Sequence, residues 1–514
     1  MLSKKGKVYL IGAGPGDIGL LTVKGMRCLQ KADTVVYDFH INAQILNYID
    51  HDAEFIYAGK RGGHHEMTQD QINQALISEA KKGKLVCRLK GGDPFIFGRG
   101  GEEAEALVAE GIEFEIVPGI SSSIAAPAYA GIPLTHRKCS SSFSVITGNE
   151  DINKQESTID WTKLVSGFDT LVFLMGVKNI EKIVLKLTEH GKPPDTPVAV
   201  VRWGTRPDQK TVVGTLGDIA GQVKAEIIRP PAVMVVGNTV KLRDTLNWYE
   251  KKPLFGHRVL ITREYTQDYA ALEDLGAEIF EFPTIKTLPP KNFDSLDASI
   301  DDIVSYDWLI FSSANGFKFF IQRFLAKDRD IRDLKGIKLC AIGVKTAGAM
   351  RNYGLKVDII PEEFNAEGLI SVFSRQAPGG SLKGLKFLLP RAEAARELFP
   401  QKVRELGGDI DTPVAYCTVK PEKHGKRLKR FLQEGRISIA TFTSAATFNN
   451  FIEMIGDEAM ALLGPAEIAA IGPVTERAIK KTGLKVSIVP KEATIKAMVD
   501  AIIARASKSV KDRT

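Results

Sequence analysis

The sequence predicts an α/β protein with largely parallel sheets. Short runs of β-branched residues alternate with longer amphipathic stretches along the whole chain. That alternation is the pattern of β-α-β units, whose strands lie parallel. At about 150 residues per domain, a chain of 514 residues should form several such lobes. With 44% hydrophobic and 25% charged residues, the composition is that of a globular rather than a disordered protein.

The first elements are expected in the order strand, helix, strand. Residues 7–11 (KVYLI) are expected to form a buried strand, and apolar residues recur at helical spacing over 20–29. Further strands are expected at 34–37, 85–89 and 114–117. A charged segment with Pro and Gly at 248–256, followed by a new strand at 258–262, predicts a boundary between two halves of the chain.

The C-terminal half contains an internal repeat. Four pairs of segments match at offsets of 128 to 131 residues: 261–263 with 389–391, 309–314 with 440–445, 340–343 with 469–472, and 354–357 with 483–486. Two lobes of similar fold would place their equivalent loops around one cleft. A duplicated scaffold with one functional lobe is the alternative.

The net charge and the cysteine content indicate which class of ligand and which cellular compartment to expect. The net charge is +7 with basic and acidic residues interleaved, which favours a small polyanionic substrate over nucleic acid. The five cysteines are far apart and form no CxxC pair, so neither a disulfide framework nor a zinc site is expected. No apolar run approaches the ~18 residues of a membrane helix, and the N-terminal apolar run is too short for a signal peptide. We therefore expect a cytoplasmic protein that binds no membrane.

Three glycine-rich turns follow expected strands in the N-terminal half. They are 12–16 (GAGPG), 91–101 (GGDPFIFGRGG) and 118–123 (PGISSS). Glycine at such density lets the backbone approach a ligand closely. The first turn is similar to a dinucleotide-binding loop, but Pro15 breaks the usual spacing. Because Asp38 ends the next expected strand, a nicotinamide cofactor remains an alternative.

The N-terminal half resembles the uroporphyrinogen-III C-methyltransferases of the tetrapyrrole methylase group over residues 6–249. The resemblance rests on these three turns and on 171–176 (LVFLMG), 204–205 with Gln209, and 247–248. It implies a two-lobed α/β enzyme, usually a homodimer, that holds S-adenosylmethionine in the cleft between its lobes. Another methylase of the group, acting on a later corrinoid or on a protein side chain, is the alternative.

The resemblance also implies a cofactor site and an acid–base pair. The expected cofactor contacts are Pro15, Gly91, Gly92, Asp93, Ile96, Ser121, Ser122, Met175 and Gly204. The acid–base pair falls on Asp38 and Lys60, although both could be surface ion-pair members, and Asp93 could be a loop cap. The Arg-Leu-Val that the family has after this Asp is replaced here by 39–41 (FHI), which leaves the local substrate contacts open.

Substrate carboxylates require cationic side chains, and Arg suits them because its guanidinium forms two parallel hydrogen bonds with a carboxylate. The candidates are Arg61, His64, Arg99, His136 and Arg137. His64 and His65 are adjacent, but no third ligand is evident in the sequence, so no metal is expected.

The C-terminal half resembles uroporphyrinogen-III synthase over residues 256–503. The shared segments are 261–263 (ITR), 311–315 (FSSAN), 341–343 with Thr346, 413–418 (PVAYCT), 442–445 (FTSA) and 471–475 (IGPVT). This family has two flavodoxin-like lobes joined by a two-stranded connection and uses no cofactor. The resemblance implies one lobe from 257–285 with 418–507, and another from 286–417.

The synthase resemblance implies that facing loops bind a linear substrate with eight carboxylates through hydroxyl, backbone N–H and guanidinium donors. The expected contacts are Arg263, Ser313, Thr346, Arg391, Ser444 and Thr475. Tyr416 matches a family tyrosine that helps the substrate hydroxyl leave as water. It could equally be a half-buried strand tyrosine, and the serine and threonine hydroxyls could be helix N-caps.

Together the two resemblances predict a bifunctional tetrapyrrole enzyme: a methyltransferase at 1–250, a linker at 251–256, a synthase at 257–507 and a basic tail at 508–514. The synthase would cyclise hydroxymethylbilane to uroporphyrinogen III with inversion of ring D. The methyltransferase would then methylate C2 and C7 to give precorrin-2, for sirohaem or for cobalamin. A non-catalytic bilobal binding module is the alternative for the C-terminal half.

Overall fold

The chain divides into two compact units in the computed structural model, which describes residues 6–49, 52–59, 67–149, 158–363, 366–376, 381–395, 397–421 and 425–511. The first unit comprises Met1–Phe282, Leu428–Ala445 and Met460–Thr514. The second unit comprises Pro283–Arg427 and Ala446–Ala459. The N-terminal half and part of the C-terminal half therefore belong to one unit.

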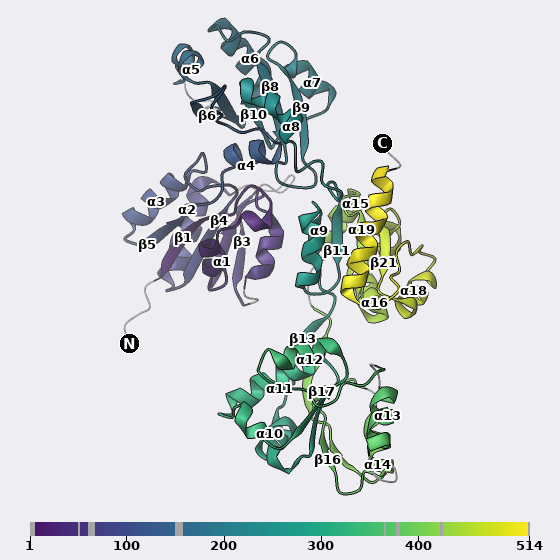
Figure 1. The fold of residues 1–514 in the computed structure, drawn as a ribbon. Helices are drawn as coiled ribbons and strands as arrows, with labels where there is room; N and C mark the ends of the chain where they lie inside the picture. Colours follow the sequence, from purple (N-terminus) through teal and green to yellow (C-terminus); the bar gives the residue numbers. More distant parts are fainter. Residues whose placement is uncertain are drawn as a thin grey trace. The chain divides into compact units, whose positions relative to one another are not determined.

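The first sheet is parallel throughout, as predicted (Figure 1). Its order is β3-β2-β4-β1-β5, with strands β1 (Lys7–Gly12), β2 (Thr34–Tyr37), β3 (Glu54–Tyr57), β4 (Leu85–Lys90) and β5 (Glu113–Val117). Helices α2 (Gln69–Lys81) and α3 (Gly100–Ala109) cover the face that carries Val8 and Leu10, whereas Ile11 belongs to the core cluster on the other face. Burial of both faces explains the continuous apolar runs of these strands.

The first helix begins later than predicted. A 3-10 turn at Ile18–Leu20 precedes α1 (Val23–Leu29), so the helical spacing over 20–29 does not correspond to one helix. The backbone of Thr22 is extended, and its hydroxyl oxygen accepts a hydrogen bond from the Gly25 N–H (3.1 Å). This N-cap fixes the start of α1 at residue 23.

The second sheet differs from the predicted parallel arrangement. Its order is β6-β7-β10-β8-β9, with strands β6 (Phe143–Thr147), β7 (Thr170–Leu174), β8 (Pro197–Arg202), β9 (Lys210–Thr215) and β10 (Ala232–Val236). Strands β6 and β7 are parallel and the other described pairs are antiparallel. For β8 and β9 the reason is connection length: residues 203–209 are too few for the crossover that a parallel pair requires. Helices α5 (Trp161–Gly167), α6 (Ile180–Glu189) and α7 (Ile219–Ala225) cover one face, and α4 (Ser122–Tyr129) packs on the other.

The C-terminal half contains two four-stranded parallel sheets of equivalent strand order, which confirms the repeat. The first is β12-β11-β20-β21, formed by β11 (Arg258–Ile261), β12 (Glu278–Glu281), β20 (Ile439–Phe442) and β21 (Glu467–Ala470). The second is β18-β16-β14-β15, formed by β14 (Trp308–Phe311), β15 (Lys338–Ala341), β16 (Lys386–Leu388) and β18 (Asp409–Asp411). The registers also correspond, since Val259 pairs with Ile439 and the equivalent Phe387 pairs with Trp308.

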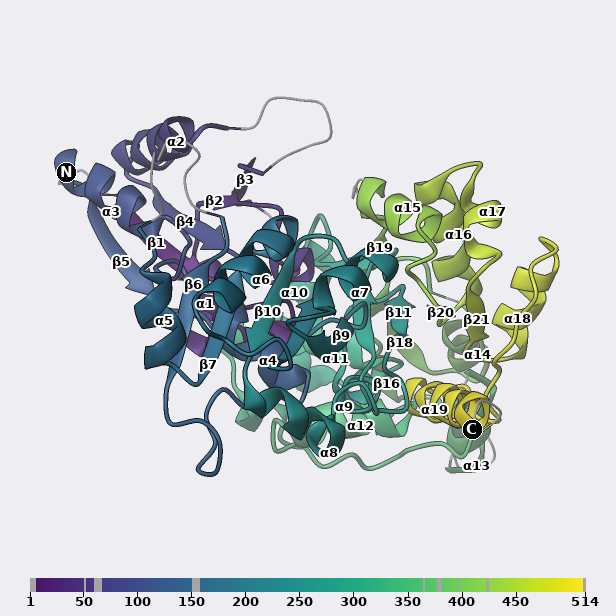
Figure 2. The same cartoon turned by 90° about the horizontal axis from the view of Figure 1, so that it is seen from above.

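Helices and one further sheet complete the C-terminal half. Helix α19 (Ile495–Lys511) covers one face of the first repeated sheet (Figure 2), where Met498 and Val499 join Val259 in the core. A three-stranded sheet in the second unit has the order β13-β19-β17, from β13 (Lys286–Leu288), β17 (Arg391–Ala392) and β19 (Val414–Val419). The remaining helices are α8 (Arg243–Leu246), α9 (Ala270–Asp274), α10 (Asp294–Asp301), α11 (Ala314–Ala326), α12 (Val344–Arg351), α13 (Ala366–Gln376), α14 (Leu398–Glu405), α15 (Lys426–Gln433), α16 (Ala445–Ile455), α17 (Ala459–Leu463) and α18 (Pro473–Lys480).

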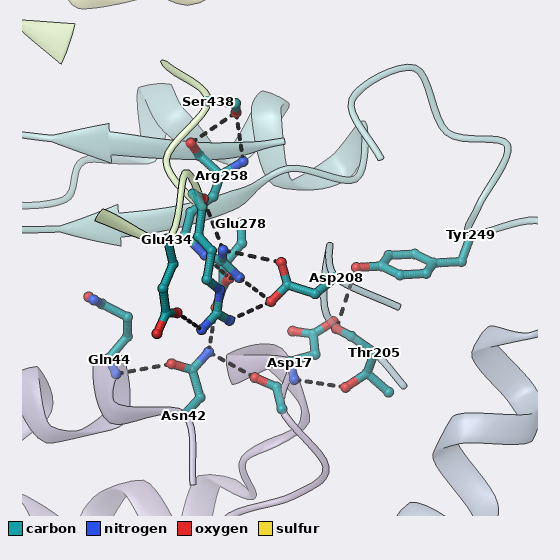
Figure 3. A network of polar contacts seen from close by, with 12 residues as sticks. Asp17, Asn42, Gln44, Thr205, Asp208, Tyr249, Arg258, Glu278, Glu434 and Ser438 are labelled. Atoms are coloured by element: carbon teal, nitrogen blue, oxygen red, sulfur yellow. Dashed lines mark hydrogen bonds and ion pairs between the residues drawn. The ribbon is translucent and has the colours of Figure 1, made fainter. Parts of the chain in front are cut away.

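A charge network around the buried Arg258 joins the N-terminal half to the first repeated sheet inside the first unit (Figure 3). Arg258, at the start of β11, is 2% exposed and forms ion pairs with Glu278 of β12 (2.5 Å) and with Asp208 (3.1 Å). Arg436 pairs with the same Asp208 carboxylate at 2.5 Å. Charges removed from water are tolerated when they are paired in this way, and removing one partner is costly.

The two arginines control the ionisation of Asp208. Burial alone would raise the pKa of this carboxyl, but Arg258 and Arg436 outweigh burial and lower the pKa below its usual value. In an unfolded chain an aspartate has a pKa of about 4. The pairing of Asp208 therefore stabilises the folded chain above about pH 4, and this stabilisation is lost as the pH falls through the lowered value.

We expect Asp208→Asn to lower the free energy of unfolding at neutral pH and to weaken its dependence on acid. The wild-type chain should lose stability more steeply than the variant below about pH 4, because only the wild type must protonate this carboxylate. Denaturant titrations at pH values from about 7 to 3 measure both effects. The exposed Asp195, changed to Asn, is the matched control. Parallel pH curves for wild type and Asp208→Asn would contradict the prediction.

Candidate functional site

The three glycine turns meet at the carboxyl end of the first sheet. Gly14 and Gly92 exchange two backbone hydrogen bonds, from Gly14 N–H to Gly92 O (3.2 Å) and from Gly92 N–H to Gly14 O (2.8 Å). A Cβ added to Gly119 would lie 2.4 Å from the Gly92 oxygen and 2.6 Å from the Gly12 Cα, so no side chain fits there. Ligands bind at this end of parallel α/β sheets. The turns that carry most of the predicted cofactor contacts, Pro15 included, are thus brought together.

Asp93 holds two of these turns in place. The residue is 9% exposed, and its Oδ1 accepts hydrogen bonds from the N–H groups of Phe95 (2.8 Å) and Ile96 (3.1 Å). Its Oδ2 accepts a hydrogen bond from the Gly119 N–H (3.0 Å). These contacts are those of a loop cap, the alternative that the sequence left open beside cofactor contact.

Predicted contacts of both polar and apolar kind border the glycine turns. Gly92 has a φ of 69°, and a Cβ added there would lie 3.7 Å from the Ser122 nitrogen. Ser121 caps α4, accepting a hydrogen bond from the Ser123 N–H at 3.3 Å. Ile96 is 40% exposed in the loop after Asp93. Backbone polar groups and an apolar side chain are therefore offered at the same edge of the sheet.

The second sheet contributes Met175 and Gly204, which follow β7 and β8. Met175 has a φ of 59° and is 49% exposed, a left-handed conformation of the kind that gathers at functional sites. A Cβ added to Gly204 would lie 2.4 Å from the Ala126 Cβ, so this loop packs tightly on α4. The Asp17 N–H donates to Thr205 Oγ1 (3.0 Å), which joins the first glycine turn to the Gly204 loop.

Asp38 ends β2 at the same edge as the glycine turns. Its side chain is 22% exposed; Oδ1 accepts a hydrogen bond from the His40 N–H (3.1 Å), and Oδ2 lies 3.5 Å from Arg88 Nη2. The predicted partner Lys60 and the predicted substrate contacts Arg61 and His64 lie outside the described residues.

A buried charge cluster lies next to Asp38 and was not predicted from the sequence. Arg88 and Lys90 of β4 and Glu103 of α3 have side chains 4%, 5% and 0% exposed. Glu103 Oε1 lies 3.2 Å from Arg88 Nε and 2.6 Å from Lys90 Nζ, and burial with the nearby Arg88 lowers the pKa of Lys90. The sequence feature that could have indicated this cluster is the presence of two cationic residues in an otherwise apolar strand. The cluster fixes Arg88, which in turn holds the Asp38 carboxylate from its buried side.

The other cations predicted to bind substrate lie on the surface of the N-terminal half. Arg99 is in the left-handed region, with a φ of 59°, and pairs with Glu102 of the same helix at 2.5 Å. Arg137 is exposed, and His136 is half-buried with its Nδ1 accepting a hydrogen bond from the Lys138 N–H (3.3 Å). Arg99 and Arg137 are thus both accessible to an anion.

Tyr416 and Ser313 form the second candidate site, in the second unit. Tyr416 lies in β19 and its hydroxyl is 3.1 Å from Ser313 Oγ. Ser313 also caps α11 by accepting a hydrogen bond from the Gly316 N–H (3.0 Å), so the N-cap alternative describes it correctly. Phe319 stacks on the Tyr416 ring, with centroids 5.9 Å apart and planes 18° apart. The phenol is held at the N-terminus of a helix, where donors converge.

The remaining predicted synthase contacts are divided between the two units. In the second unit, Thr346 is buried on α12, and Arg391 of β17 forms an ion pair with Glu397. In the first unit, Arg263 is exposed just after β11, and Thr475 is buried on α18. Ser444 is half-buried before α16.

The described residues show neither a metal-binding cluster nor a membrane-spanning helix. They contain no group of three His, Cys, Asp or Glu side chains that could hold a metal ion. None of the helices described is long and apolar enough to cross a membrane.

Comparison with known proteins assigns each half to a family model. Residues 7–220 match the model described as tetrapyrrole (corrin/porphyrin) methylases. Residues 267–500 match the model described as uroporphyrinogen-III synthase HemD. The first match includes the whole first sheet and the second sheet except β10, and the second match includes the two repeated sheets except β11.

Individual relatives agree with this division. The porphyrin biosynthesis protein HemD of Ruminiclostridium josui is 36% identical over 97% of this chain and 98% of its own length. The uroporphyrinogen-III C-methyltransferase of Priestia megaterium is 54% identical over 46% of this chain and 98% of its own length. The S-adenosyl-L-methionine-dependent uroporphyrinogen III methyltransferase of Methanosarcina barkeri is 53% identical over 48% of this chain and 96% of its own length. The chain therefore belongs to two enzyme families joined in one polypeptide, the tetrapyrrole methylases in its N-terminal half and the uroporphyrinogen-III synthases in its C-terminal half.

Proposed function

We propose that the chain carries out two consecutive reactions of tetrapyrrole synthesis. Its C-terminal half cyclises hydroxymethylbilane to uroporphyrinogen III with inversion of ring D. Its N-terminal half then transfers methyl groups from S-adenosylmethionine to C2 and C7, giving precorrin-2. The observation that carries the proposal is the meeting of three glycine turns at the carboxyl end of the first sheet, in a chain that matches both enzyme families.

S-adenosylmethionine fits the residues around the glycine turns. Glycine at position 92 leaves open the space beside the Ser122 nitrogen, which a Cβ would occupy. The backbone of Gly91, Gly92, Ser121 and Ser122 would hold its polar parts, and Met175 would pack on an apolar part. The name of the Methanosarcina barkeri relative supports this cofactor. When bound, the cofactor supplies a methyl group made electrophilic by its sulfonium charge.

Asp38 is the proposed base for methyl transfer. A fully substituted pyrrole carbon that gains CH₃⁺ leaves a cationic ring, which returns to neutrality by losing a proton to a nearby carboxylate. Arg88 lies 3.5 Å from Asp38 Oδ2, and Glu103 anchors Arg88 at 3.2 Å, so the carboxylate has a fixed orientation. Lys60 is the proposed partner acid, and Arg61, Arg99 and Arg137 the proposed substrate contacts.

Tyr416 is the proposed acid for cyclisation. Hydroxymethylbilane loses a hydroxyl as its C–O bond breaks, and the Tyr416 phenol can donate the proton that turns this hydroxyl into water. Ser313 Oγ, 3.1 Å away, can orient the phenol, and the phenolate regains its proton when ring D loses one as the macrocycle closes. This step needs no cofactor, and donors on the surrounding loops would hold the substrate carboxylates.

The division of the chain is also proposed. We assign the methyltransferase to 1–250, the linker to 251–256, the synthase to 257–507 and a basic tail to 508–514. The synthase lobes would be 257–285 with 418–507, and 286–417. A homodimer formed through the N-terminal half follows from the methylase resemblance. The five free cysteines favour the cytoplasm.

Incubation of the protein with hydroxymethylbilane and labelled S-adenosylmethionine tests the function. We expect uroporphyrinogen III to form and then to gain two labelled methyl groups per tetrapyrrole molecule. If only the symmetrical type-I ring forms, the synthase proposal fails and a binding module replaces it. If uroporphyrinogen III added directly gains no label, the methyltransferase proposal fails and another methylase of the group replaces it.

Asp38→Asn should slow methyl transfer by about 100- to 10,000-fold, because the variant lacks the base that accepts the ring proton. Label incorporation into added uroporphyrinogen III at saturating cofactor measures the effect. Cyclisation of hydroxymethylbilane by the same preparation should be unchanged. Asp70→Asn, an exposed aspartate on α2, is the control. Full methyl transfer by Asp38→Asn would refute the assignment of the base.

Tyr416→Phe should slow formation of uroporphyrinogen III by about 100- to 10,000-fold, because the ring remains but its acidic hydroxyl is lost. The rate of hydroxymethylbilane consumption and the ratio of type-III to type-I product measure the effect. Tyr353→Phe, which alters a tyrosine 43% exposed in the same unit, should behave as wild type. A Tyr416→Phe enzyme as fast as wild type would leave Tyr416 with only its packing role against Phe319.

A further inference from the structure

The first glycine turn of the methyltransferase is held by a residue of the synthase half. Asn42 is 3% exposed, and its Nδ2 donates to the carbonyl oxygen of Gly16 (2.9 Å) and to Glu278 Oε1 (2.8 Å). Gly16 follows the predicted cofactor contact Pro15. The position of this turn therefore depends on Glu278, which belongs to β12 of the first repeated sheet (Figure 3).

The loop after β8 is held by the same sheet through a different residue. Asp208 lies in this loop, four positions after Gly204, and receives two hydrogen bonds from Arg258, at 3.1 and 3.3 Å. The next residue, Gln209, accepts a hydrogen bond from the Thr205 N–H (2.9 Å). Asp208 and Gln209 thus connect Arg258 to the segment that contains Gly204.

Arg258 connects these two attachments. Its guanidinium pairs with Glu278 on one side and with Asp208 on the other, and Nη1 also donates to the Arg436 carbonyl oxygen (3.0 Å). The group lies over the Phe431 ring, 5.0 Å from its centroid, and is 2% exposed. Loss of this charge would leave Glu278 without its arginine partner and would weaken the hold on Asp208.

We propose that Arg258, a residue of the synthase half, is a positioning residue for methyl transfer. Through Glu278 and Asn42 it sets the first glycine turn, and through Asp208 it sets the Gly204 loop. Both segments border the cofactor site assigned under the proposed function, on which this inference rests. The synthase half thereby holds two loops of the methyltransferase cofactor site in position, in addition to being an enzyme.

The test compares the KM for S-adenosylmethionine, kcat for methyl transfer and the rate of cyclisation in full-length variants. Arg258→Met should raise the KM by about 5- to 150-fold, the usual range of coupling between sites, and leave kcat within about twofold of wild type. Arg258→Lys, which keeps the charge but not the fork of donors, should give an intermediate KM. Arg505→Met removes an exposed arginine, 57% accessible, and should change neither KM nor kcat.

Asp208→Asn is the second variant, because it leaves the Arg258–Glu278 pair intact inside the synthase half. It should raise the KM while cyclisation continues at the wild-type rate. The double variant Asp208→Asn with Arg258→Met should raise the KM by less than the product of the two single effects, since each single change already disrupts the Arg258–Asp208 contact. An unchanged KM in both single variants, with normal cyclisation, would overturn the inference. Equal losses of kcat, cofactor affinity and cyclisation in Asp208→Asn would also overturn it, because they indicate general unfolding.

The wild-type enzyme separates this inference from the function on which it rests. If wild type transfers no methyl group from S-adenosylmethionine, the proposed function fails. If wild type does transfer it, and the variants have the wild-type KM, the positioning role alone fails.

Discussion

The backbones of Gly12, Gly92 and Gly119 lie directly against one another, and the parallel strands of the first sheet bring these three residues together. A Cβ on Gly12 or Gly119 would lie within 2.7 Å of neighbouring backbone atoms, so side chains are excluded from this point. The strands before these turns are parallel, which places their carboxyl ends at one edge. Burial of both sheet faces then holds those ends in place and restricts the movement of the turns that follow them.

Paired buried charges provide the second kind of order. Arg88 and Lys90 share the Glu103 carboxylate, while Arg258 lies between Glu278 and Asp208. An unpaired charge at such a depth would be costly, so each network permits few arrangements of its members. Both networks lie next to segments that carry predicted site residues. Apolar packing forms the layers of the fold, whereas these charges specify the positions of the loops at its edge.

Local patterns predicted the repeat and the strands β1, β2, β4, β5 and β11, because burial and periodicity are properties of short segments. The helix predicted at 20–29 starts later than expected, because the N-cap at Thr22 determines the first residue of the helix and the spacing of apolar residues does not. The second sheet was predicted parallel because a strand pattern does not specify its direction; for β8 and β9 the short connection at 203–209 decides it.

The candidate site was predictable only in part, for the same reason. The high density of glycine predicted the three turns, and the structure shows that they lie together. The role of Asp93 as a loop cap and the contact of Tyr416 with Ser313 required the fold itself. The pairing of Asp208 with Arg436 joins residues 228 positions apart, and no local pattern contains such information.

That separation has a consequence for how the chain is made. A ribosome completes the N-terminal half well before it reaches Arg436, and at 5–20 residues per second the delay between Asp208 and Arg436 is about 10 to 50 s. Arg258 follows Asp208 by only 50 residues, so for most of this interval the nascent methyltransferase lacks Arg436, the second of the two cations that neutralise Asp208. The enzyme that acts second in the proposed reaction order is thus translated first, and its last loop contacts form only after most of the other enzyme has been synthesised.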